Sequence, residues 1–153
     1  MNTSKTRHMA LFFTYSMICL LARLLPFRPL QTSLTLAVQM PMSRQWGGVM
    51  GFVFGFINMI SFDLITGSMG WWTLITATSY GMLAYLIRIC INTTFTTRYL
   101  YAAVVATLSY DILTGIIFGP WLFGQSLFVT CIGQIPFTIM HLIANVTFSS
   151  LLS

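Results

Sequence analysis

The chain has 153 residues, of which 57% are hydrophobic and only 6% are charged, and its seven basic and two acidic residues give a net charge of +5. Soluble domains carry about a quarter charged residues, so this composition excludes an ordinary soluble fold and indicates a lipid-embedded membrane protein. Apolar residues run continuously instead of alternating, which predicts an all-α fold and disfavours a β-barrel.

A first transmembrane helix is predicted at 8–25, where an apolar run follows two basic residues and ends before Pro26. A basic start followed by an apolar run also imitates a secretory signal peptide. No small-x-small cleavage site follows the run before Arg23. We therefore expect this segment to be retained as the first helix.

The second predicted helix, 30–44, is the least apolar and contains Pro41, which is typical of a short polar-faced helix or a re-entrant segment. The third and fourth, 46–66 and 71–90, are each long enough to cross a bilayer at about 1.5 Å per residue. Four glycines within 47–55 predict close approach of another helix, from this chain or from a partner.

A fifth helix is predicted at 98–115 and a sixth at 136–152, with Pro136 in its first turn. Glycines and prolines punctuate the uncharged residues between them. We expect 116–133 to be a hydrophobic connection on the outer side, either irregular or with a short helix in it. The chain is thus predicted to be one domain, 1–153, with six transmembrane helices.

Basic residues lie near the predicted segment ends, which indicates a topological use of the positive charge and not nucleic-acid binding. Six crossings with a cytoplasmic N-terminus place five basic residues inside and two outside, as the positive-inside rule requires. The inside residues are Lys5, Arg7, Arg44, Arg88 and Arg98, and the outside residues are Arg23 and Arg28.

The two acidic residues, Asp63 and Asp111, occupy the same place in two similar phrases, 61–67 and 109–115. Both reach the outer face in this topology. We interpret them, with the glycines that end the phrases, as structural loop anchors that pair with outer arginines or accept backbone N–H bonds. Direct contact with a cationic ligand stays open. The anchor residues are Asp63, Gly67, Asp111 and Gly115.

The last predicted helix carries Phe137, His141 and Asn145 on one stripe. A polar stripe in a membrane helix must face another helix or a cavity. Tryptophans near the same outer level favour a ligand pocket, although they also fit an interfacial belt. The candidate ligand-binding residues are Arg23, Trp71, Trp72, Trp121, Gln125, Phe137, His141 and Asn145.

Enzyme chemistry has little support in this chain. It has no glutamate, no HExxH pair, no nucleophile elbow and no phosphate loop, and its three cysteines lack metal-ligand spacing. An intramembrane aspartyl protease would need glycines around Phe62-Asp63 that are absent, although Tyr110-Asp111 fits half of that pattern. We expect no catalytic residue, no cofactor and no metal.

The glycines of 51–55, the phrase 61–67, the Gly-Trp-Trp turn at 70–72 and the pattern Pro136-Phe137-xxx-His141-xxx-Asn145 together resemble the substrate-binding S component of energy-coupling factor (ECF) transporters. The resemblance implies a six-helix bundle in the plasma membrane of a prokaryote. It also implies that the protein captures a vitamin or related micronutrient at its outer face, with the loops between paired helices around the ligand.

Such a subunit works with a transmembrane T component and two ATPases, so ATP hydrolysis would belong to the partners. Many S components dock through an Ala-xxx-Ala motif in the first helix. In this chain the nearest match is Ala10-xxx-Thr14, which has the required small residues but departs from the motif.

Two other functions stay open. The rod-shape-determining D proteins, thought to be scaffolds of bacterial wall synthesis, also have six helices and a glycine-rich segment that leads to an Asp-Leu-x-x-Gly phrase. The second phrase at Asp111 and the polar stripe of the last helix are not needed by a scaffold. A solitary proton-coupled carrier is the third possibility, and it would work without an ATPase.

Overall fold

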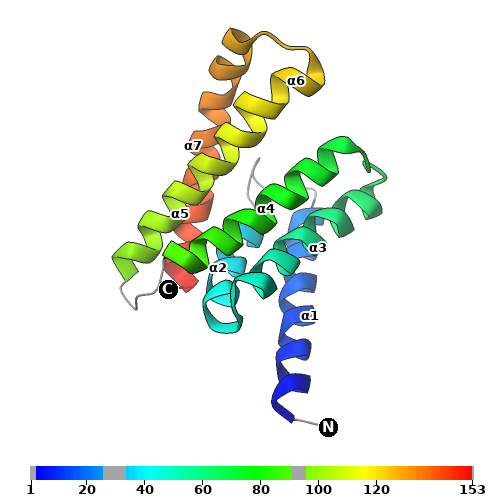
Figure 1. The fold of residues 1–153 in the computed structure, drawn as a ribbon, viewed down its shortest axis with the longest axis vertical. Coiled ribbons are helices and arrows are strands. Elements are labelled where there is room, and N and C mark those ends of the chain that lie inside the picture. Colours follow the sequence, from blue (N-terminus) through cyan, green and yellow to red (C-terminus); the bar gives the residue numbers. More distant parts are fainter. Residues whose placement is uncertain (1–2, 26–33, 91–95, 153) are drawn as a thin grey trace.

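The computed structural model describes residues 3–25, 34–90 and 96–152, which form helices and their connections with no strand among them (Figure 1). The elements are α1 Thr3–Leu24, α2 Leu34–Trp46, α3 Gly48–Thr66, α4 Trp71–Cys90, α5 Thr96–Asp111, the π-helix η1 Ile112–Phe118, α6 Gly119–Phe123 and α7 Leu127–Leu152. The all-α prediction is confirmed for the described residues.

Two helical hairpins organise these elements. α3 packs along α4, and the continuous run of α5, η1 and α6 packs along α7 (Figure 1). α2 lies between the hairpins and contacts α3, α4 and α7, while α1 packs on α3. The turns of the two hairpins point toward the upper side of Figure 1, so the residues beside them share one end of the bundle.

Three helical segments of the described residues are long and apolar enough to cross a membrane: Gly48–Thr66, Arg98–Phe123 and Leu127–Leu151. α2 has 13 residues. The first four residues of the predicted second helix, 30–33, lie outside the described residues, and the described part extends about 20 Å at 1.5 Å per residue. Its polar side chains face the interior of the bundle, since Gln39 and Ser43 on α2 are completely buried.

The glycines of α3 face helices of the same chain. A Cβ atom on Gly51 would lie 2.6 Å from Cβ of Ser43 and 3.1 Å from Cβ of Ala84. A Cβ on Gly55 would collide with Gln39 and approach the backbone of Tyr80. The small residues therefore allow α2 and α4 to approach α3 closely. The helices that pack on these glycines belong to the same chain.

The predicted connection at 116–133 is wrong for most of its length. Helix continues from α5 through η1 and α6 to Phe123, and only 124–126 form a turn before α7. Gly124 at this turn has a φ of 63°, in the left-handed region that glycine adopts without strain. α7 begins at Leu127, so Pro136 lies inside it and not in its first turn.

Candidate functional site

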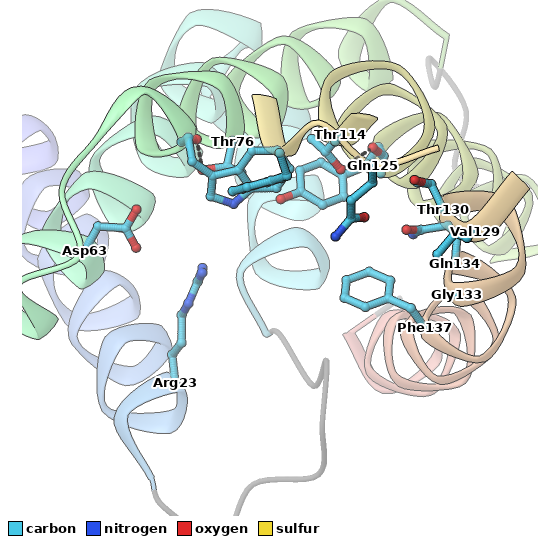
Figure 2. A pocket seen from close by; sticks show the side chains of 15 residues that line it. Arg23, Asp63, Thr76, Thr114, Gln125, Val129, Thr130, Gly133, Gln134 and Phe137 are labelled. Carbon is cyan, nitrogen blue, oxygen red and sulfur yellow. Dashed lines mark hydrogen bonds between the residues drawn. The ribbon is translucent and has the colours of Figure 1, made fainter. Parts of the chain in front are cut away.

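A cavity of about 560 Å³ opens at the bundle end that holds the two hairpin turns (Figure 2). Its walls come from the end of α1, the end of α3, the start of α4, the run from α5 to α6, and the first half of α7. The polar lining residues are Arg23, Asp63, Thr76, Thr114, Gln125, Thr130 and Gln134, and the aromatic ones are Trp72, Tyr110, Phe123 and Phe137.

Arg23 reaches the cavity from the last turn of α1. Its Nη1 donates a hydrogen bond to Sδ of Met59 at 2.6 Å. The guanidinium lies 4.2 Å from the ring centroid of Phe62, which is within cation–π distance. Its Nε is buried and has no partner among the described residues. A thioether and a ring thus position the cation without neutralising it.

Asp63 lies in the last turn of α3, and its carboxylate points into the cavity (Figure 2). The turn after it is closed by backbone groups, because N–H of Ser68 donates to the carbonyl oxygen of Asp63 at 2.9 Å. Gly67 ends the helix with a φ of 70°, as expected of a turn residue. The described side-chain hydrogen bonds of this turn involve Thr66, Ser68 and Thr73, and none involves the Asp63 carboxylate that we expect to anchor it.

Asp111 occupies a different environment from Asp63, which corrects the expectation of two equivalent turn anchors. Its carboxylate Oδ1 lies 2.8 Å from Nδ1 of His141, and both side chains are almost fully buried. The chain stays helical beyond it, so Asp111 and Gly115 are not at a turn. Gly115 lies against the side chain of Gln134, where it permits close packing of η1 on α7.

The polar side chains of the α7 stripe, His141 and Asn145, face the helix α5. This is the contact between two helices that we weighed against a ligand pocket. Nδ2 of Asn145 donates to Oγ1 of Thr107 at 3.0 Å, one helical turn from the Asp111–His141 pair. Neither His141 nor Asn145 lines the cavity. Two lining rings, Tyr110 and Phe137, each have their centroids 5.7 Å from that of His141, so the imidazole contacts the cavity lining without being part of it.

Of the eight residues predicted to bind ligand, four line the cavity: Arg23, Trp72, Gln125 and Phe137. Trp72 packs on Phe123 with ring centroids 5.3 Å apart. Trp71 and Trp121 are 78% and 76% exposed and do not line the cavity, which fits the alternative of interfacial residues.

Sequence reasoning missed several polar lining residues, chiefly Thr76, Thr114 and Thr130. Thr76 follows Trp72 by four positions on α4, so the two share a face. Thr130 and Gln134 share the α7 face that continues to Phe137. The helical spacing of Thr130, Gln134 and Phe137 is visible in the sequence only if the last helix begins before 130, whereas the sequence predicts a start at 136.

The described residues contain no group of three or more His, Cys, Asp or Glu side chains that could hold a metal ion. Within the same residues the only contact between a carboxylate and a basic side chain is the one between Asp111 and His141. The cavity therefore offers one cation, one anion, amides, hydroxyls and rings, which are groups that bind a small organic molecule. Comparisons with known protein families, curated proteins and solved structures find no match to this chain.

Proposed function

We propose that the protein binds a small organic ligand in this cavity and acts as the substrate-binding subunit of an ECF-type importer for a vitamin or related micronutrient. The cavity itself carries the proposal. Its volume of about 560 Å³ falls within the roughly 300–1,000 Å³ of small-molecule sites. Its lining combines aromatic rings with a few polar groups, which is the usual composition of such sites.

The proposed location is the plasma membrane of a prokaryote, with a cytoplasmic N-terminus and the cavity at the outer face. Placement of charge supports this orientation. Arg44, Arg88 and Arg98 lie at the ends of α2, α4 and α5 that are remote from the hairpin turns. An excess of basic residues marks the cytoplasmic side.

The energy for transport would come from partners, a T component and two ATPases. α1 offers the proposed docking surface, where Ala10 and Thr14 are both exposed. The Thr14 hydroxyl bonds to the carbonyl oxygen of Ala10 at 2.9 Å, so its polarity is satisfied within the helix. A helix surface with small side chains and no unpaired hydroxyl group allows close contact with another membrane helix.

A solitary proton-coupled carrier is the second candidate, because one observation favours it. The Asp111–His141 pair is buried beside the cavity, and buried Asp and His side chains form proton relays in membrane transporters. Such a carrier would not need an ATPase.

Two measurements test these proposals. Mass spectrometry of the protein purified in mild detergent should identify a bound organic compound. Uptake of that compound in cells should require co-expression of an ECF T component and its ATPases. Uptake that instead follows the proton gradient without them would favour the carrier, and absence of any bound or transported compound would contradict both.

A further inference from the structure

The cavity contains two charged side chains of opposite sign, and both are on the same side. In Figure 2, Arg23 and Asp63 point into the open space from the wall formed by α1 and α3. Gln125, Gln134 and Phe137 lie across from them. The lining thus divides into a charged wall and an uncharged wall of amides and rings.

The Arg23 charge is held in place but not neutralised. Its described contacts are Sδ of Met59 and the face of Phe62, and its buried Nε has no partner. A partly buried arginine is costly unless an anion or water compensates its charge. Its planar guanidinium can donate two parallel hydrogen bonds to a carboxylate or a phosphate.

The Asp63 carboxylate is in the complementary position. It forms no ion pair with Arg23 or any other described residue, although it lines the same cavity. A carboxylate in a partly desolvated cavity attracts an ammonium group strongly and repels a second anion. An anionic ligand on Arg23 would therefore approach Asp63 at a cost unless it also carried a positive group.

We infer that the ligand is a small zwitterion with a flat apolar portion, a deepening that rests on the proposed function. Its anionic group binds Arg23 and its cationic group binds Asp63. The flat portion extends between Trp72 and Phe137, where the amides of Gln125 and Gln134 can bind polar atoms at its edge. A molecule with a single charge would leave one of the two side chains uncompensated.

Matched probes test this inference on the full chain in lipid nanodiscs. Phenylalanine and tryptophan are zwitterions, phenethylamine and tryptamine lack the carboxylate, and 3-phenylpropionate and indole-3-propionate lack the ammonium group. The comparison uses whichever amino acid, phenylalanine or tryptophan, binds more tightly. We expect each of its two singly charged analogues to bind at least about tenfold more weakly than the amino acid, because each analogue loses a charge-assisted hydrogen bond.

Two variants assign each charge to its side chain. In Asp63→Asn, the analogue without the ammonium group should bind within about threefold of the zwitterion. In Arg23→Gln, the analogue without the carboxylate should bind within about threefold of the zwitterion, because each variant removes one selective contact. Arg44→Gln is the matched control, since Arg44 is exposed and outside the cavity. Arg23→Lys, which keeps the positive charge, should retain the preference for the zwitterion over the amine if Arg23→Gln fails to fold.

The charge of the compound that co-purifies separates this inference from the proposed function. A bound zwitterion, with preferences that change in the two variants as stated, supports both. A bound compound of single charge, or acids and amines that bind as tightly as zwitterions, overturns the inference and leaves the proposed function standing. If neither the probes nor any co-purified compound binds, both fail.

Discussion

At the scale of single residues, the two carboxylates of the chain have separate roles. Asp111 is buried against His141, whose ring is held by Tyr110 and Phe137. Asp63 points into the cavity and closes no turn with its side chain. One carboxylate therefore belongs to the interior of the bundle and the other to the cavity lining.

His141→Phe should lower the free energy of unfolding by about 3–5 kcal/mol, because it leaves the buried Asp111 carboxylate without its partner. Asp111→Asn should cost only about 1 kcal/mol, since the amide oxygen can still accept a hydrogen bond from Nδ1 of His141. Unfolding of both variants in detergent micelles measures the difference. An equal or reversed ranking would show that the pair does not stabilise the α5–α7 interface in this way.

Asp63→Asn should change the free energy of unfolding in the absence of ligand by less than about 0.5 kcal/mol, because no described contact of its carboxylate is lost. The same unfolding measurement serves, with Asp111→Asn as the comparison. A loss at Asp63 as large as at Asp111 would restore the interpretation of both residues as structural anchors.

At the scale of elements, close contact among α2, α3 and α4 holds the centre of the bundle. Nε2 of Gln39 on α2 donates to the carbonyl oxygen of Tyr80 on α4 at 3.1 Å, and Oγ of Ser43 donates to that of Ala84 at 2.6 Å. The glycines of α3 leave room for these side chains. A short polar helix is thus stabilised inside the bundle by hydrogen bonds to the backbone of its neighbour.

Gly51→Ala should destabilise the protein by about 1–3 kcal/mol, because the new methyl group would overlap Ser43, which cannot move without shifting α2. Gly133→Ala is the matched control. It lies in α7, and an added Cβ would have no atom of another helix within 4 Å, so its effect should be neutral or slightly stabilising. Equal thermal stabilities of the two variants in detergent would contradict this packing.

At the scale of the whole molecule, part of the architecture could be predicted from sequence and part could not. Continuous apolar runs indicated the third and fourth helices, and α4 covers the residues predicted for the fourth. The glycines and the proline of 115–124 predict a loop, because these residues have a low helix propensity in water. In a lipid environment the backbone must form its own hydrogen bonds, which favours helix even at these residues. The segment is accordingly helical, as η1 and α6.

The candidate site shows the same division. Aromatic and polar residues near one level pointed to a pocket, and four of the eight candidates line the cavity. Which of two adjacent tryptophans faces inward depends on helix rotation, since neighbours on a helix point about 100° apart. Trp72 faces the cavity and Trp71 faces outward. His141 faces α5, where its imidazole contacts the buried carboxylate of Asp111.

Cysteine labelling tests the proposed orientation of the bundle. In a variant without its native cysteines, Ser68→Cys, between α3 and α4, should react with a membrane-impermeant maleimide in intact cells. Gln45→Cys, near the end of α2, should react only after permeabilisation, because it belongs to the proposed cytoplasmic end. The opposite pattern of labelling would reverse the orientation and place the cavity on the cytoplasmic side.

The most direct test of a ligand site in the cavity compares two neighbouring tryptophans. With the compound identified by mass spectrometry as the probe, calorimetry in detergent should show that Trp72→Ala weakens binding about tenfold or more, through loss of an aromatic wall. Trp71→Ala should bind as the wild type does, because Trp71 lies outside the cavity. Unchanged binding in Trp72→Ala, or equal losses in the two variants, would contradict binding in this cavity.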